Sequence, residues 1–177
     1  MKFTLHAVRK ILLWTAFLQL LIITQTASAN ASPDTLVKVE PSTSIANVGE
    51  TFTVNITITD VQNLFGLEVT LHWDSSILQM MGADVRLGVE SHPDGVLHEP
   101  VSIVKNETIQ EEGKYQLVST STGRETPSFN GTGNTVRITF NVTDVGSCEL
   151  NLEAKLANKP PLGSVSSPIA HTTMDGF

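Results

Sequence analysis

The sequence predicts an all-β protein, a single antiparallel β-sandwich with jelly-roll topology and about nine strands. Apolar and polar residues alternate with a period of two over several short segments, which is typical of strands that bury one face. Turn-rich connections separate these segments, and none of them has the period of an amphipathic helix. The chain has 177 residues, of which 40% are apolar. We therefore expect one domain with one sizeable core.

The central strand of this sandwich is predicted at 65–73, where the alternation is strict. Its inward row is aliphatic or aromatic, as expected for the middle of a sheet that packs against a second sheet. Its outward row is short and polar, and it consists of Gly66, Glu68, Thr70 and His72. This outward row is either a recognition surface or an ordinary solvated face, since threonine is common on such faces.

Two strands are expected before this one. Residues 36–40 alternate and stop at Pro41, which predicts a short first strand. Residues 50–61 alternate cleanly, and a tight connection at 61–63 leads into the central strand. The inward residues of this second strand are Phe52, Val54, Ile56 and Ile58.

After the central strand the pattern is weaker. Residues 74–76 are typical of a turn or a helix cap, and 77–81 return to the core as a short strand or a single helical turn. The segment 85–89 suggests an edge strand. The His-Pro-Asp-Gly sequence at 92–95 indicates a turn.

Five further segments complete the predicted sandwich. Strands at 96–104 and 114–120 flank a polar loop at 105–113, and a second long loop at 124–133 follows. Strands are then expected at 134–143 and 148–156, and a proline-rich break at 159–163 precedes a candidate last strand at 169–177.

The first 29 residues have the features of a secretory signal peptide. Basic residues among the first ten precede an apolar run at 11–23, and a small-residue cleavage pattern ends at Ala29. A membrane span needs about 20 apolar residues, so we expect cleavage rather than an uncleaved anchor helix. This predicts a secreted or cell-surface protein without membrane insertion, in which 30–35 is a polar lead-in and 36–177 is the sandwich domain.

Charge and cysteine content exclude several classes of function. Cleavage removes three of the 11 basic residues and none of the 18 acidic ones, which leaves a net charge of −10. Such a protein has no electrostatic basis for binding nucleic acid or anionic membranes. Cys148 is the only cysteine, so no internal disulfide can form. Its place on an apolar row predicts a buried thiol rather than a nucleophile.

Catalysis finds little support in the motifs. The histidines after the leader do not form an HExxH pair, no serine lies in a nucleophile elbow, and no glycine-rich phosphate loop occurs. His92 and His98 with Asp94 and Glu99 could form a weak metal site, but solvated turn residues are favoured. A pair of carboxylates for glycoside hydrolysis needs only to meet in space, although no cleft-forming insertion favours it. We expect no enzyme, no cofactor and no metal.

Direct sugar binding by stacking would need exposed planar aromatic side chains. Most aromatic residues of the domain have inward parity, and only Tyr115 and Phe129 are expected to point outward. Two such residues are too few for a flat sugar-binding strip.

Asn-X-Ser/Thr sequons occur five times, and glycans attached to them must point to solvent. Asn30 lies in the lead-in. We expect Asn55 and Asn141 on the outward faces of strands, and Asn106 and Asn130 in loops. These four predict glycosylation sites on the domain, although threonine-rich strand faces also create sequons by chance.

Several segments resemble cohesin domains. They include Gly-Glu-x-Phe at 49–52, Asn-Leu-Phe-Gly at 63–66 with Trp-Asp at 73–74, and the alternating segment 133–142. The resemblance covers 36 to about 156, nearly the whole predicted domain. One departure is Trp73-Asp74-Ser75, where the family usually has Tyr-Asp-Pro. A lone domain with many sequons is most similar to the single-domain cohesin-like proteins of archaea and bacteria.

Cohesins are nine-stranded jelly-roll receptors that bind dockerin modules and assemble extracellular polysaccharide-degrading complexes. The resemblance therefore implies a secreted, non-catalytic module that binds a dockerin-type partner. In the family, the dockerin contacts outward residues of the third, fifth, sixth and eighth strands. Carried over by position, with one parity of 96–104, this face holds Glu68, Thr70, His72, Gln116, Val118, Arg137 and Thr139.

Two other functions remain open from the sequence. A carbohydrate-binding module of the same fold would bind polysaccharide directly and would expose Tyr115 or Phe129 on a flat face. A structural surface or adhesion domain would have glycan-covered outer faces and no discrete site.

Overall fold

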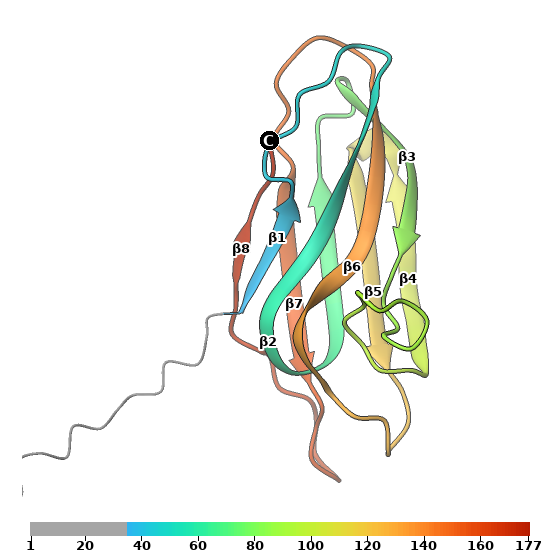
Figure 1. Ribbon diagram of the computed structural model, residues 1–177, viewed down its shortest axis with the longest axis vertical. Coiled ribbons are helices and arrows are strands. Elements are labelled where there is room, and N and C mark those ends of the chain that lie inside the picture. The colour runs from blue at the N-terminus through green and yellow to red at the C-terminus, as the bar shows by residue number, and fades with distance from the viewer. Residues whose placement is uncertain (1–34) are drawn as a thin grey trace, which may run out of the picture. The chain divides into compact units, whose positions relative to one another are not determined.

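A computed structural model of the chain describes residues 35–177 (Figure 1). Over this range the structure is all-β, with no α-helix and one short 3₁₀ helix. The predicted signal peptide lies outside the described residues. The elements are β1 Leu36–Glu40, β2 Thr51–His72, β3 Leu78–Val85, β4 Val101–Ile109, η1 Gln110–Glu112, β5 Lys114–Ser121, β6 Phe129–Val142, β7 Asn151–Asn158 and β8 Thr172–Met174.

The long strand β2 connects the two layers of the sandwich. Its first part, residues 51–61, pairs with β1 and β6, and its second part, residues 66–72, pairs with β5 and β7. The bend lies between Asp60 and Asn63, which have φ angles of 54° and 59°. Asp and Asn tolerate this left-handed conformation better than other non-glycine residues. The tight connection predicted at 61–63 is thus a bend within one continuous strand.

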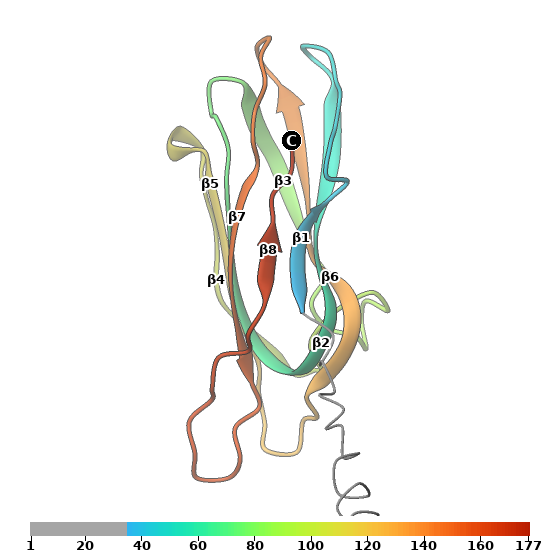
Figure 2. The same ribbon diagram turned by 90° about the vertical axis from the view of Figure 1, so that its left-hand side faces the viewer.

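Two layers follow from this bend, and both are visible in edge view (Figure 2). We call β8-β1-β2(51–61)-β6-β3 the first layer and β4-β5-β2(66–72)-β7 the second layer. Because β2 serves both layers, eight strands fill nine places, and the predicted jelly-roll sandwich is confirmed. All pairs between named strands are antiparallel except β1 with β8, which is parallel.

Aromatic side chains join the layers at one end of the core. The Phe140 ring of β6 packs edge-on against Trp73, with ring centroids 5.2 Å apart, and stacks on Phe52 at 5.6 Å. Phe140 is completely buried, and the Trp73 indole donates from Nε1 to the backbone carbonyl of Leu78 at 3.1 Å. The buried indole nitrogen is thereby satisfied, as burial of a polar atom requires.

Several predicted boundaries were wrong because edge strands carry a weak pattern. The strand predicted at 96–104 begins only at Val101, and the polar loop predicted at 105–113 is strand up to Ile109. Residues Val96 and Leu97 are fully buried, but they belong to a loop with one isolated bridge, between Gly88 and Leu97. Of the edge strand predicted at 85–89, only Val85 is in a strand, as the last residue of β3. The loop predicted at 124–133 is strand from Phe129 onward. The last strand, predicted at 169–177, is only Thr172–Met174.

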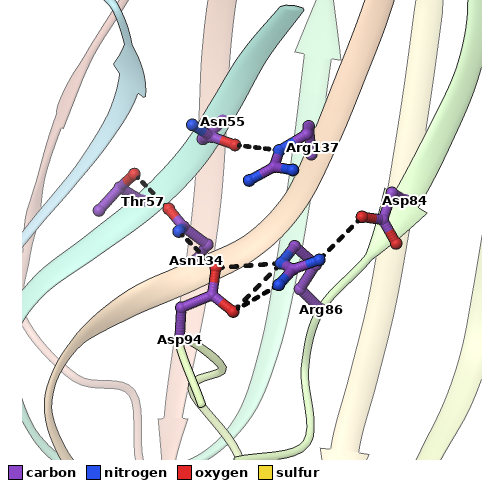
Figure 3. Close-up of polar contacts among 7 residues, drawn as sticks. All are labelled: Asn55, Thr57, Asp84, Arg86, Asp94, Asn134 and Arg137. Atoms are coloured by element: carbon purple, nitrogen blue, oxygen red, sulfur yellow. Dashed lines mark hydrogen bonds and ion pairs between the residues drawn. The ribbon is translucent and has the colours of Figure 1, made fainter. Parts of the chain in front are cut away.

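A polar network holds the loop after β3 against the first layer (Figure 3). Arg86 donates from Nε and Nη2 to both carboxylate oxygens of Asp94, at 2.9–3.1 Å, and from Nη1 to Asp84 at 3.0 Å. Asn134 of β6 donates from Nδ2 to Asp94 at 3.0 Å and accepts from Thr57 of β2 at 2.8 Å. The loop is therefore tied to two strands through one carboxylate.

Candidate partner-binding face

The outer face of the second layer presents a continuous array of polar side chains from adjacent strands. Register places Thr70 of β2 opposite Gln116 of β5 and Glu153 of β7. Directly opposed residues of antiparallel strands point to the same side of a sheet. We call this surface the partner face; it consists of Glu68, Thr70 and His72 of β2, Lys114, Gln116 and Val118 of β5, Asn151, Glu153 and Lys155 of β7, and Lys105 and Glu107 at the β4 edge.

Glu68 is the most connected side chain of the partner face. Its Oε1 accepts from Gln116 Nε2 at 2.8 Å, and its Oε2 pairs with Lys155 Nζ at 3.1 Å. These contacts link the adjacent strands β5, β2 and β7 across the face. Lys155 remains 79% exposed, so its charge is available to a partner and the pair itself adds little stability.

Thr70 was expected in a wet row, but it is only 6% exposed. It lies in a central strand, and longer side chains stand directly opposite on both sides. Packing among these neighbours therefore shields a short side chain even on an outer face. Glu68 and His72 are half-buried. The surface is thus a close-packed platform rather than a set of extended, fully hydrated side chains.

A shallow hollow marks one end of the partner face. It has a volume of about 410 Å³ and is lined by Glu68, Val118, Lys155 and Ala157, with segment 166–168 as its rim. The rim is fixed to β7, because the Ser167 backbone N–H donates to Asn158 Oδ1 at 2.7 Å. The hollow gives the otherwise level face one concave feature, which a protruding side chain of a partner could fill.

Two predicted site residues do not belong to this face. Arg137 and Thr139 lie on β6, where they pair with Asn55 and Thr53 of β2 and with Asp84 and Gly82 of β3. All of these belong to the first layer, so Arg137 and Thr139 point away from the second layer. Their predicted outward parity was correct, but their predicted grouping with Glu68, Thr70 and His72 was wrong.

The sequence prediction also missed residues that the structure places on the face. The outward row of β7 is Asn151, Glu153 and Lys155, and β4 adds Lys105 and Glu107 at the edge. The alternation of 148–156 already contained the β7 signal, since Leu150, Leu152 and Leu156 are buried. Lys105 and Glu107 had no such signal, because residues 105–108 are all polar and were therefore predicted to be a loop.

The two aromatic residues expected to point outward do not form a sugar-binding strip. Tyr115 is 1% exposed, with its hydroxyl donating to Asn106 Oδ1 at 2.8 Å, and burial raises its pKa above its ordinary value. Alternation that places Gln116 outward necessarily places Tyr115 inward. Phe129 is half-buried beside His98, with ring centroids 6.4 Å apart.

Residues with catalytic potential are dispersed or engaged in structural contacts. In the part of the chain that the structure describes, no group of three His, Cys, Asp or Glu side chains could hold a metal ion. His98 contacts Glu90 at 2.8 Å, and this pairing lowers the pKa of Glu90. Burial raises the pKa of the half-buried Cys148 thiol, which disfavours the reactive thiolate.

Residues 35–177 contain no helix that is both long and apolar enough to cross a membrane.

The family of the chain follows from a match to the cohesin domain model over residues 37–160. This match spans well over half of the chain and nearly all of the sandwich. The chain therefore belongs to the cohesin domain family. No curated protein matches the chain.

Several solved cohesins are similar in fold to this chain. The sixth cohesin of scaffoldin B from Acetivibrio cellulolyticus, solved with a mutant Cel5 dockerin, has a TM-score of 0.59 and 14% identity, with 81% of this chain and 96% of that chain covered. The seventh ScaB type I cohesin from Pseudobacteroides cellulosolvens has a TM-score of 0.58 and 18% identity, with 80% and 88% covered. A non-cellulosomal cohesin from the hyperthermophilic archaeon Archaeoglobus fulgidus has a TM-score of 0.57 and 12% identity, with 81% and 88% covered.

Proposed function

We propose that this protein is a non-catalytic binding module that recognises a dockerin-type protein partner through the partner face. Support comes first from its membership of the cohesin family. Several cohesins of the same fold were solved in complexes with dockerins. At 12–18% identity these likenesses concern the fold, so the binding site must be argued from this chain's own residues.

The observation that carries the proposal is the arrangement of the second layer. Four adjacent strands present one continuous polar surface with an apolar contribution from Val118 and one hollow at its end. Charged and amide side chains alternate on it, which suits a partner with matching polar and charged groups. The first layer is less open near Asn134 of β6, because the loop that contains Arg86 and Asp94 packs against it there.

Secretion, surface location and participation in a polysaccharide-degrading assembly belong to the same proposal. They depend on the signal peptide predicted from residues 1–29 and on the partner's identity. Net acidity of the domain accords with an extracellular protein that does not bind nucleic acid.

Calorimetric titration of residues 30–177 with dockerin modules encoded by the same genome tests this proposal. We expect saturable binding to at least one dockerin with one site per sandwich. Insoluble and soluble polysaccharides serve as the second arm. Binding to polysaccharide without binding to any dockerin would instead support a carbohydrate-binding module, for which the buried Tyr115 gives no support.

A further inference from the structure

Four asparagines of the described chain stand in Asn-X-Thr sequons, and in two of them a donor-only partner fixes the amide orientation. Asn55 Oδ1 accepts from Arg137 Nε at 3.1 Å, and Asn130 Oδ1 accepts from the backbone N–H of Asn63 at 2.8 Å. Both donors can only donate, so the carbonyl oxygen must face them. Asn106 Oδ1 also accepts from the Tyr115 hydroxyl at 2.8 Å, although a hydroxyl can donate or accept and does not by itself fix the amide. In each case Nδ2, the atom that carries an N-glycan, is turned away from the structural contact.

Two asparagines outside sequons use Nδ2 as a structural donor, whereas Asn158, also outside a sequon, accepts through Oδ1 from the Ser167 backbone N–H. Asn134 donates from Nδ2 to Asp94, and Asn47 donates from Nδ2 to Glu50 at 3.1 Å. The contrast between Asn55 and Asn134 is visible in one view (Figure 3). A sugar on Nδ2 of Asn134 would disrupt the loop network, whereas a sugar on Nδ2 of Asn55 leaves the Arg137 contact intact.

The fold also places the four sequons away from the partner face. Asn55 and Asn141 lie on the outer face of the first layer, opposite Arg137 and Thr51 respectively. Asn106 pairs with the buried Leu117, so on the edge strand β4 it reaches solvent at the side of the sandwich. Asn130 is exposed beside the bend of β2. The partner face contains one asparagine, Asn151, which Leu152 and Glu153 follow, so it is not a sequon.

We propose that Asn55, Asn106, Asn130 and Asn141 are N-glycan acceptors, and that their glycans cover the first layer and the sides of the sandwich while the partner face stays bare. The donor is a lipid-linked oligosaccharide. Nδ2 forms a bond to the anomeric carbon as the bond from that carbon to the lipid phosphate breaks, and the amide proton leaves with the phosphate. The assignment of the four asparagines as glycan acceptors does not depend on the proposed function. The idea that the partner face stays bare for a dockerin does rest on it.

Occupancy is measured on the full protein purified from its native cells, by intact mass and by fragmentation of glycopeptides. We expect oligosaccharide on the peptides that contain the four sequons and none on those that contain Asn47, Asn134 or Asn151. Unmodified asparagine at all four positions would overturn the assignment, and so would glycan at Asn134.

A designed sequon tests whether a glycan on the partner face blocks dockerin binding. Glu68→Asn creates an Asn-Val-Thr sequon with Val69 and Thr70 on the partner face, and Glu68→Gln is the matched control without a sequon. Val118→Asn, which creates a sequon with Ser119 and Thr120, serves where the first variant does not fold or is not modified. We expect glycosylated Glu68→Asn to bind the dockerin found by calorimetry at least about tenfold more weakly than Glu68→Gln.

The four native sequons are removed together by Asn→Gln substitution as the complementary experiment. We expect dockerin affinity to change by less than about twofold. An increase of more than about tenfold on removal would overturn the idea that native glycans leave the site open. If glycans are present and no form of the protein binds a dockerin, the acceptor assignment holds and the proposed function fails.

Discussion

Phe140 is the side chain through which the two layers meet. It lies on β6 of the first layer, is completely buried, and contacts both Trp73 and Phe52. Such aromatic contacts add to the free energy gained by burying the ring itself. We infer that the packing of Phe140, Trp73 and Phe52 holds the two layers together at this end of the sandwich.

Replacing Phe140 by Ala should lower the free energy of unfolding by about 3–5 kcal/mol, because the ring would leave a cavity in a closely packed core. Urea denaturation of the variant and the wild type provides the measurement. Thr139→Ala is the matched control on the same strand, since it removes only an exposed hydroxyl contact with Thr53. Equal effects of the two substitutions would contradict this description of the core.

Asp94 is the central acceptor of the loop network, and its side chain is about a third exposed. Hydrogen bonds from Arg86 and then from Asn134 hold the pKa of Asp94 well below its ordinary value of 3.8. The stabilisation that the carboxylate provides is therefore complete above the pKa of the unfolded chain and is lost as the pH falls towards the folded value.

The Asp94→Asn variant should be less stable by about 1–2 kcal/mol at neutral pH, a value reduced for solvent screening. Its disadvantage should shrink as the pH falls from about 5 to about 2, because the wild type then loses the same interaction. Denaturant titrations across this range measure both effects. Asp60→Asn is the control, since Asp60 is exposed and Asn tolerates its left-handed φ of 54°. A constant difference across the pH range would argue against the proposed role of the carboxylate.

At the scale of elements, close backbone contacts and the Arg86–Asp94 pair together hold the loop after β3 against β6. Gly133 of β6 packs directly on the loop, so that a Cβ there would lie 2.5 Å from the carbonyl oxygen of Gly95 and 2.7 Å from that of Asp94. Backbone atoms cannot move aside as a flexible side chain can. Glycine at 133 thus allows the loop to approach the sheet.

Gly133→Ala should cost about 1–3 kcal/mol of unfolding free energy, since the loop or strand must shift to admit the methyl group. Hydrogen exchange should also accelerate at the loop amides of Val89 and Gly95. Gly82→Ala on β3 is the matched control, because a Cβ there meets nothing within 4 Å. Similar stability and exchange in both variants would rule out the close approach as a structural determinant.

Elements with two distinct faces could be predicted from the sequence. The inward rows of β2 and β6 were correct because a buried face imposes alternation. The bounds of the edge strand β4 could not be predicted, since its Lys105–Glu107 region is polar at successive positions and the predicted strand at 96–104 overlaps β4 only over 101–104. Long-range contacts such as Gly133 with Gly95 leave no local pattern at all.

At the scale of the whole molecule, alternation reveals which way a side chain points but not the layer to which its strand belongs. Arg137 and Thr139 have the outward parity that the sequence predicted, yet they lie on the layer opposite to Glu68 and Thr70. In the structure the eighth strand place belongs to β7, so the outward row of β7 takes the place of the two predicted residues Arg137 and Thr139.

The opposite placement of Thr70 and Thr139 provides the most direct test of where a partner binds. Each is replaced by Arg in a separate variant, and calorimetry measures affinity for the dockerin that binds the wild type. We predict that Thr70→Arg weakens binding at least about thirtyfold, or about 2 kcal/mol, and that Thr139→Arg leaves it nearly unchanged. Val118→Arg replaces the first variant where urea denaturation shows that Thr70→Arg is unfolded. Loss of binding in Thr139→Arg, with full affinity in a folded Thr70→Arg or Val118→Arg variant, would contradict the assignment of the second layer as the partner face.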